Sequence, residues 1–244
     1  MDNEIFDTKV FEGKTAFISG ATGGIGKSVA LALAKCGCDL FLTGKDHKKL
    51  EALIDELSVF DIHIQYFPGN LLVEEDIYKI IHQAKKAFPS IDIIINSAGI
   101  FPNEMIFEVE DDDYGNAMDI NFKSAFMFIR EFARGMVKRK WGRIVNIGSS
   151  SAYGGFAGTS IYCASKHALL GFSRAIHDEL KADNVRTLYI SPSSTQSNMG
   201  LATKGQDYST FLDPYDVAKY VVFAISFESN IVSEEIFLKR MLIR

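Results

Sequence analysis

Cysteine and proline are scarce in this sequence of 244 residues, and long apolar runs are missing. The three cysteines (Cys36, Cys38 and Cys163) are too few and too irregularly spaced for a disulfide framework or a zinc site, and the five histidines show no metal-ligand spacing. No apolar run reaches the ~18 residues that a membrane span needs, and the acidic N-terminus does not resemble a secretory signal. We therefore expect no metal, no membrane association and a cytoplasmic location.

An excess of positive charge is also missing. The chain has 26 Lys and Arg against 31 Asp and Glu, a formal net charge of −5. This balance argues against a nucleic-acid partner, because binding to a phosphate backbone needs a basic surface. The basic run at residues 138–140 is interpreted as a helix C-terminus, where cations oppose the negative end of the helix dipole.

Short apolar segments alternate with segments of helical periodicity along the chain. Strands are predicted over residues 15–19, 39–43, 63–67, 91–95, 144–147, 185–190 and 235–239, and helices over 27–35, 46–58, 74–88, 116–137, 159–181 and 214–227. The alternation predicts an α/β fold, a single domain over residues 1–244 with a doubly wound, Rossmann-type, seven-stranded parallel sheet and helices on both faces. Residues 1–12 are expected to form an N-terminal extension and residues 191–213 a substrate lid loop.

A glycine-rich turn, Gly20 to Gly26, follows the first predicted strand and opens the first helix. Glycines at such a turn let backbone N–H groups approach a pyrophosphate, and the helix dipole adds a favourable positive potential. The spacing is GxxxGxG rather than GxGxxG. The alternative interpretation is a tight strand-to-helix turn without a ligand.

A hydroxyl, a phenol and an ammonium group lie in the segment from Ser149 to Lys166. Tyr162 and Lys166 are four residues apart on a predicted helix, so their side chains project from one face. A lysine cation about 5 Å from the phenol, at an effective dielectric of ~20, favours the phenolate by roughly 3 kcal/mol. We therefore expect the pKa of Tyr162 to fall by about two units, toward the range of general acid–base catalysis.

Together these motifs resemble the short-chain dehydrogenase/reductase family over almost the whole chain. The positions that match the motifs of the family are Gly20, Gly24, Gly26, Asn96, Ala98, Gly99, Asn121, Ser149, Tyr162 and Lys166. Among its subgroups, the 3-oxoacyl-acyl-carrier-protein reductases are the most similar. The resemblance implies an NAD(P)-dependent oxidoreductase that reduces a carbonyl to a secondary alcohol, or catalyses the reverse reaction, with hydride supplied by the cofactor.

The resemblance also implies a role for each catalytic residue. Tyr162 exchanges a proton with the substrate oxygen, and Ser149 hydrogen-bonds to that oxygen and stabilises its developing charge. Lys166 lowers the pKa of the tyrosine and binds the nicotinamide ribose. Asn121 holds a water that relays protons through the lysine; its alternative role is that of a polar residue hydrogen-bonded inside a helix. The two serines that follow Ser149 are its rivals for the serine role.

NADP(H) is the preferred cofactor and NAD(H) the alternative. By resemblance, an acidic residue after the second strand would bind the ribose hydroxyls of NAD and repel the 2′-phosphate of NADP. Gly44 and Lys45 occupy this place, and Asp46 is adjacent. The expected cofactor contacts are Gly20, Thr22, Gly23, Gly24, Ile25, Gly26, Lys45, Asn70, Leu71, Asn96, Ala98, Gly99, Tyr162, Lys166, Pro192, Ser193, Thr195 and Ser197.

The substrate is expected to be a small carbonyl compound or alcohol, and an acyl thioester is one option. The alternatives are a ketone of the sugar, polyol or polyketide type and, in a different class, a non-catalytic dinucleotide-sensing protein. The apolar contacts expected from the lid are Met199, Leu201, Tyr208 and Phe211. The resemblance implies a homodimer or homotetramer formed through the helix over residues 116–137 and the next helix. A core position is the alternative for the aromatic stripe Phe122, Phe126, Phe128 and Phe132.

Overall fold

The computed structural model describes residues 8–201 and 205–242 and contains one seven-stranded sheet with all strands parallel. The strand order is β3-β2-β1-β4-β5-β6-β7. The strands are β1 (Thr15–Ser19), β2 (Asp39–Gly44), β3 (Ile64–Pro68), β4 (Ile93–Asn96), β5 (Gly142–Ile147), β6 (Val185–Pro192) and β7 (Glu235–Leu238). This sheet confirms the predicted doubly wound fold, in which the strand order reverses between β1 and β4.

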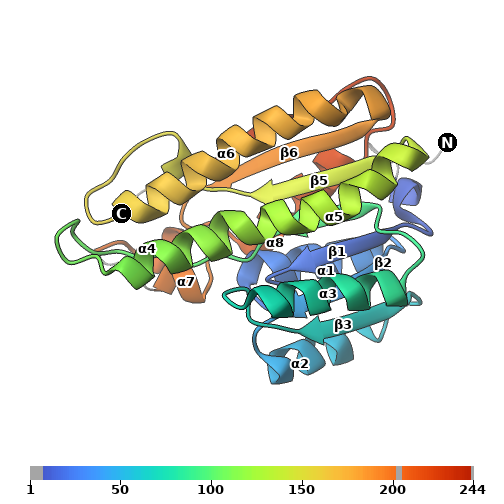
Figure 1. Ribbon diagram of the computed structural model, residues 1–244, viewed down its shortest axis with the longest axis horizontal. Coiled ribbons are helices and arrows are strands. Elements are labelled where there is room, and N and C mark those ends of the chain that lie inside the picture. Colours follow the sequence, from blue (N-terminus) through green and yellow to red (C-terminus); the bar gives the residue numbers. More distant parts are fainter. Residues whose placement is uncertain (1–7, 202–204, 243–244) are drawn as a thin grey trace.

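Helices cover both faces of the sheet (Figure 1). They are α1 (Gly24–Lys35), α2 (His47–Leu57), α3 (Glu74–Ala87), α4 (Asp111–Met118), α5 (Ser124–Arg139), α6 (Ser160–Leu180), α7 (Asn198–Leu201) and α8 (Pro214–Ile225). One core cluster joins the sheet to α1, α2 and α8, and a second joins it to α3, α5 and α6. A smaller third cluster includes Leu169 and Leu170 of α6 and Tyr189 of β6. Strands β1 to β6 supply both larger clusters, because successive side chains point to opposite faces, whereas β7 packs Ile236 and Leu238 on the first cluster alone.

Aromatic packing divides the predicted stripe of phenylalanines between core and surface. Phe128 and Phe132 of α5 are buried against Phe17 of β1, with ring centroids 4.7 and 5.0 Å apart. Phe122 and Phe126 are half-buried and pack instead on Phe172 of α6. The core interpretation is therefore correct for half of the stripe. The other half forms the contact between the π-helical turn, α5 and α6.

Two helical segments differ from the prediction for physical reasons. The helix α1 begins at Gly24 rather than residue 27, because the last glycines of the turn adopt helical backbone. The segment 116–137 is not one helix: α4 ends at Met118, a π-helical turn (Asp119–Lys123) follows, and α5 begins at Ser124. An extra residue per turn re-aims the helix, and such turns are frequent at functional sites.

The predicted extension and lid also contain regular structure. Within residues 8–12, a 3-10 turn (Thr8–Phe11) places Phe11 in the core beside α1, where its side chain is fully buried. In the 191–213 segment, β6 continues to Pro192, and α7 and a 3-10 turn (Tyr208–Thr210) follow. Hydrogen bonds from Gln196 N to Leu212 O and from Leu212 N to Ser194 O join the two arms of this segment.

Cys38 and Cys163 are buried and Cys36 is half-buried, all as free thiols. In the part of the chain that the structure describes, no helix is long and apolar enough to cross a membrane. The same residues include no cluster of three or more His, Cys, Asp or Glu side chains that could hold a metal ion.

The amino edge of the sheet is held by a buried carboxylate, which generates a stability prediction. Asp92 is 6% exposed; it accepts hydrogen bonds from Thr15 N at 3.1 Å and from Arg139 Nη2 at 3.0 Å. We expect Asp92→Ala to lower the free energy of unfolding by about 3 kcal/mol, because a buried N–H and a guanidinium lose their acceptor. Urea unfolding measures this loss, and exposed Asp61→Ala is the control. Equal stabilities for the two variants would contradict it.

Candidate active site

A cavity of about 1450 Å³ opens at the carboxyl edge of the sheet, bordered by the segments that follow all seven strands. This is the edge at which doubly wound sheets bind ligands. Among the expected catalytic and cofactor-binding residues, those that line the cavity are Gly20, Thr22, Gly23, Gly24, Ile25, Lys45, Asn70, Leu71, Ala98, Gly99, Ser149, Tyr162, Lys166, Pro192, Ser193, Thr195 and Ser197. Gly26, Asn96 and Asn121 lie behind this lining.

The glycine turn is crowded by backbone on three sides. Gly20 has φ +67°, and a Cβ there would lie 2.5 Å from the Ala98 nitrogen after β4. A Cβ on Gly24 would lie 2.9 Å from the Gln196 carbonyl oxygen, and one on Gly26 only 2.2 Å from the Gly20 carbonyl oxygen. Side chains at these positions would separate the segments, so the glycines are required for the convergence of the loops. Gly26 thus acts in packing, behind the cavity wall.

The N-terminus of α1 faces the cavity without a side-chain cap. Gly23 is the N-cap residue and makes no side-chain hydrogen bond, and the first helical residues, Gly24 and Ile25, line the cavity. The first N–H groups of a helix have no acceptor within the helix, and the dipole places partial positive charge there. An anion in the cavity would find these donors ready.

At the β2 end of the cavity, Lys45 is exposed and Asn70 forms part of a turn. Asp46, next to Lys45, caps α2: its Oδ1 accepts from Lys49 N at 3.2 Å. Asn70 N donates to Asp76 Oδ2 at 3.1 Å and Asn70 Oδ1 accepts from Leu72 N at 3.3 Å. The main-chain donation from Asn70 is the largest cause that lowers the pKa of Asp76.

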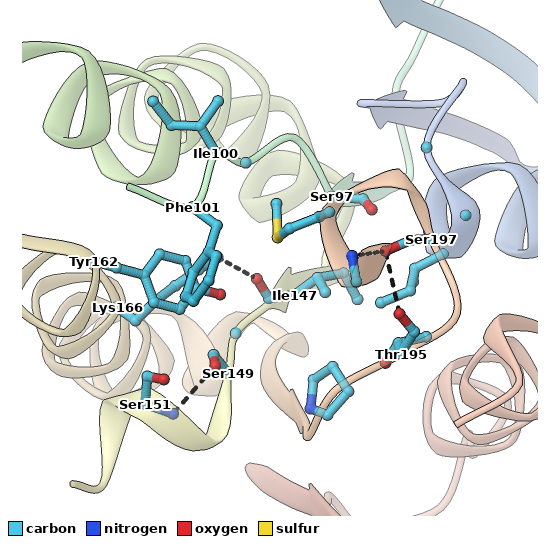
Figure 2. Close-up of a pocket in the computed structure, with 18 of the residues that line it drawn as sticks. Ser97, Ile100, Phe101, Ile147, Ser149, Ser151, Tyr162, Lys166, Thr195 and Ser197 are labelled. Carbon is cyan, nitrogen blue, oxygen red and sulfur yellow. Dashed lines mark hydrogen bonds between the residues drawn. The ribbon is translucent and has the colours of Figure 1, made fainter. Parts of the chain in front are cut away.

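Tyr162 and Lys166 lie side by side in the first turns of α6, as the four-residue spacing predicts (Figure 2). Both are buried, at 6% and 4% exposure. Lys166 Nζ donates to the Ile147 carbonyl oxygen at 3.0 Å and lies 5.8 Å from the centroid of the Tyr162 ring. This bond joins the helix to the carboxyl end of β5 and fixes the ammonium group beside the phenol.

Ser149 is the serine of the three that reaches the phenol. Its hydroxyl hydrogen-bonds to the Tyr162 side chain, and its Oγ also accepts from Ser151 N at 3.1 Å. Ser150 and Ser151 form the 3-10 turn that Ser149 caps. The main-chain hydrogen bond to Ser149 Oγ orients the hydroxyl so that its proton can be donated elsewhere. The geometry therefore favours Ser149 over its rivals.

Burial dominates the ionisation of both groups. It raises the pKa of Tyr162, and the hydrogen bond from Ser149 offsets only part of this increase. Burial also lowers the pKa of Lys166 to about 8. The expected lowering of the tyrosine pKa by the lysine is therefore wrong for this structure. The sequence estimate placed two charges in a screened medium, whereas the fold withdraws both groups from water.

Two asparagines brace the site from behind. Asn121, in the π-helical turn, accepts from Ile100 N at 2.8 Å through Oδ1 and donates through Nδ2 to the Ile100 carbonyl and to Ser165 Oγ. Asn96 Nδ2 donates to Asn146 Oδ1 at 2.8 Å. The bracing role of Asn146 was missed in the sequence; a polar residue inside an apolar strand was its signal.

The two hydroxyls expected near the cofactor face the loop backbone as well as the cavity. Ser197 Oγ accepts from Gly200 N at 3.0 Å and donates to the Thr195 carbonyl, which stabilises the start of α7. Thr195 Oγ1 donates to the Ser193 carbonyl at 2.9 Å. Both residues line the cavity, and Figure 2 shows them in the loop across from Tyr162. Their bonds give this loop a defined shape.

The wall beyond Tyr162 consists of residues that the sequence did not identify. Phe101 meets Tyr162 edge-on, with ring centroids 4.7 Å apart (Figure 2). The other such residues of this wall are Tyr153, Phe156, Gln206, Phe237, Lys239 and Arg240. Together with Phe101 they come from four separate segments and share no local motif, so no sequence signal connects them.

The four apolar residues expected to contact the substrate from the lid lie in different environments. Met199 and Tyr208 line the cavity. Phe211 is buried under Gly200, where a Cβ would lie 3.2 Å from its ring, and it is absent from the lining. Leu201 is 65% exposed and lies outside the cavity. The apolar residues of a short polar segment therefore divide between the cavity lining, packing and solvent.

Known proteins share this sequence and architecture. Residues 14–207 match the short chain dehydrogenase family. A 3-oxoacyl-acyl-carrier-protein reductase of Rickettsia felis is 31% identical over 231 residues, which are 91% of this chain and 92% of that protein. A solved short chain dehydrogenase/reductase family protein is 29% identical, with a TM-score of 0.84 over 94% of this chain and 97% of that one. A metagenomic short-chain oxidoreductase in complex with NADP is 23% identical, with a TM-score of 0.83 over 96% of this chain and 99% of that one. At this identity the similarity is one of fold alone.

The fold and the cavity define a protein of the doubly wound, Rossmann-type α/β class with its cavity at the carboxyl edge of the sheet. The family match covers most of the chain, from the first strand through the segment that follows α7, and the chain belongs to the short-chain dehydrogenase family. The protein is accordingly an NAD(P)-dependent oxidoreductase.

The buried lysine generates a prediction for stability against pH. Lys166 titrates at about 8 in the folded protein and near 10.4 in an unfolded chain, so between these values the unfolded state binds more protons. The buried lysine therefore lowers the free energy of unfolding by about 3 kcal/mol below pH 8, and this loss disappears as pH rises toward 10.4. We expect Lys166→Met to be more stable than wild type at pH 7, by a margin that shrinks at pH 10.

Urea unfolding of both proteins at the two pH values measures this difference. Lys138→Met, which removes an exposed lysine at the end of α5, is the matched control. Its free energy of unfolding should differ from that of wild type by the same amount at pH 7 and pH 10. A margin for Lys166→Met that is the same at pH 7 and pH 10 would contradict the burial argument.

Proposed function

We propose that this protein uses NADP(H) to reduce a carbonyl to a secondary alcohol, or to catalyse the reverse reaction, with Tyr162 as the general acid or base. One observation carries the proposal: Ser149, Tyr162 and Lys166 meet in the same cavity as the glycine turn at the start of α1. Acid–base groups and a phosphate cradle in a single cavity suit hydride transfer to an oxygen-bearing carbon.

The cavity residues fit a nicotinamide dinucleotide. Gly20 and Gly24 leave the backbone bare at the N-terminus of α1, where a pyrophosphate would be accommodated. Among the described residues that line the cavity, none is a carboxylate that would repel the phosphates. The bound cofactor supplies or accepts the hydride. The protein supplies the position and charge of the groups around it.

Tyr162 is the group that moves the proton. Because burial keeps its pKa high, the phenol is protonated at neutral pH and can donate to a carbonyl oxygen. Tyr153 is the rival phenol in the cavity, but its hydroxyl donates to Glu235 Oε2 at 2.6 Å and its pKa is about 12. Ser149 carries a hydroxyl that touches Tyr162, so it is placed to donate to the same substrate oxygen.

Lys166 and Asn121 serve the proton path behind the phenol. The pKa of Lys166, about 8, lies close to neutrality, which suits a group that gains and loses a proton during turnover. A Cβ on Gly99 would lie 3.3 Å from Asn121 Oδ1 and 3.8 Å from Lys166 Nζ, so both atoms border the same space. Oδ1 accepts one bond, from Ile100 N, and its second lone pair is left for a proton-relaying water.

The first test of the mechanism is Tyr162→Phe. We expect turnover to fall at least about a thousandfold in this variant, because no other group transfers a proton to the substrate oxygen. Cofactor affinity should change by only a few-fold. Steady-state rates and fluorescence titration with NADPH measure the two quantities. Tyr220→Phe, which removes the hydroxyl of an exposed tyrosine on α8, is the control. Turnover retained in Tyr162→Phe would refute the mechanism.

The preference for NADP(H) rests on Lys45. This lysine is exposed and lines the cavity just after β2, where a 2′-phosphate would be recognised. The neighbouring acid, Asp46, is engaged in capping α2 and in an ion-pair contact of 3.9 Å with Lys49. The solved relative with bound NADP is similar in fold only, so the proposal depends on this arrangement of charges.

Charge reversal at Lys45 tests the cofactor preference. We expect Lys45→Glu to weaken NADPH binding by about a hundredfold and to leave NADH binding within a few-fold, because the carboxylate repels the extra phosphate. Titration of wild type and variant with both cofactors measures the ratio. Lys48→Glu, which reverses a charge on nearby α2 outside the cavity lining, should keep the wild-type ratio. An unchanged ratio in Lys45→Glu would remove the reason for naming NADP(H).

A 3-oxoacyl thioester is the first substrate to test, because curated relatives over nine-tenths of the chain are 3-oxoacyl-acyl-carrier-protein reductases. A sugar, polyol or polyketide-type ketone is the second candidate. A non-catalytic dinucleotide-sensing protein would bind NADPH without reducing any ketone, and the convergence of Ser149 with Tyr162 and Lys166 weighs against it.

The homodimer or homotetramer and the cytoplasmic location stay predictions.

A further inference from the structure

On the basis of the proposed function, we infer that the substrate carries an oxyanion group, a carboxylate or a phosphate, in addition to its reacting carbonyl. The structure assigns the recognition of that group to Lys239 and Arg240. These residues follow β7, and both line the cavity.

The lining of the cavity has charge of one sign. Its described residues include four cations, Lys45, Lys166, Lys239 and Arg240, and no Asp or Glu. The whole chain has a net charge of −5, so this distribution is opposite to the average of the protein. The first two cations have roles with the cofactor and the phenol. The other two remain unexplained by hydride transfer.

The pairing of β7 with β6 positions this cation pair. Leu238 pairs with Pro192, Ser193 N donates to the Leu238 carbonyl at 2.8 Å, and Arg240 N donates to Ser193 Oγ at 3.1 Å. The chain after β7 is therefore fixed to the segment that borders the cavity after β6. An extended chain held at both residues cannot turn away from the cavity edge.

Lys239 stands on the same side of the cavity as the reacting hydroxyls. Its Nζ lies 4.9 Å from the centroid of the Phe237 ring, and that ring packs on Tyr153 with centroids 5.1 Å apart. Tyr153 ends the short turn that begins at Ser149. This series of contacts connects the ammonium group to the catalytic serine along one wall. A phenylalanine face holds a cation without neutralising its charge.

Arg240 is held by neutral partners alone. Its Nη2 donates to Gln206 Oε1 at 2.5 Å and its Nη1 to Thr210 Oγ1 at 3.2 Å, while the guanidinium stacks 4.8 Å from the Phe211 centroid. Its Nε is buried and has no hydrogen-bond partner among the described residues. A guanidinium with an unused buried donor is costly unless an anion compensates it.

Neither cation is neutralised by a residue that the structure describes. Across residues 8–201 and 205–242, no carboxylate lies within ion-pair distance of Lys239 or Arg240. Aromatic side chains, Phe101 and Phe156 among them, form the rest of this wall. The site therefore combines an apolar wall near the phenol with two positive charges that no described carboxylate neutralises. Its complement is a ketone or secondary alcohol that ends in an oxyanion.

Matched substrate pairs test this inference with NADPH at pH 7. One pair is acetoacetate and ethyl acetoacetate, which differ by a carboxylate. The other is acetoacetyl-4′-phosphopantetheine and acetoacetyl-pantetheine, two thioesters that differ by one phosphate. We expect the charged member of at least one pair to have a kcat/KM about tenfold higher or more, mainly through KM. The pair that shows the difference identifies whether the anion is a carboxylate or a phosphate.

Lys239→Met should reduce this preference by about fivefold, by raising KM for the charged substrate while kcat and the neutral substrate are unaffected. Arg240→Lys, with folding checked by thermal unfolding, should reduce it as well, because the planar fork is lost while the charge remains. The exposed-lysine control Lys138→Met should keep the wild-type ratio. The preference should also fall with added salt, since Lys239 is exposed.

Three outcomes would overturn the inference. They are equal kcat/KM values within both pairs, a higher value for both neutral members, and a ratio unchanged in Lys239→Met. In all three the proposed function stands, because ketones are still reduced. If wild type reduces no ketone with NADPH or NADH, the proposed function fails and the inference fails with it.

Discussion

The structure depends on one steric constraint, the absence of side chains where three loops meet. The turn after β1, the segment after β4 and the segment after β6 approach each other at Gly20 and Gly24, at distances that leave no room for a Cβ. Gly26 lets α1 begin directly against the Gly20 carbonyl. Because these contacts are between backbones, the segments that follow the strands lie close enough together to line one continuous cavity, and the N-terminus of α1 forms part of its lining.

The chemistry depends on what this cavity does to charge. Burial makes Lys166 a weaker base and Tyr162 a weaker acid than either would be in water. The Ile147 carbonyl accepts from the ammonium and Ser149 hydrogen-bonds to the phenol, so both groups keep a polar partner without a counter-ion. The absence of carboxylates from the described cavity lining leaves an electropositive space that suits a phosphate-bearing cofactor and, by our inference, an anionic substrate.

The fold was largely predictable, because alternating apolar and helical periods report burial directly. β1 has the predicted bounds, and the other six strands lie within two residues of theirs at each end. Departures occur where local sequence is ambiguous. Glycines usually end helices, yet Gly24 begins α1; and the π-helical turn before α5 leaves no break in the apolar pattern. The lid segment was predicted as a loop because its helical pieces are only one turn long.

By itself the sequence determined the order of elements, the glycine turn and the spacing of Tyr162 and Lys166, because each of these is a local property of the chain. Only the tertiary structure decided which serine meets the phenol, that Asn121 binds Ile100 and Ser165, and that Lys239 and Arg240 border the cavity. It also decided the direction of the tyrosine pKa. Desolvation and contacts between distant segments depend on which atoms surround a group after folding, and no local pattern encodes them.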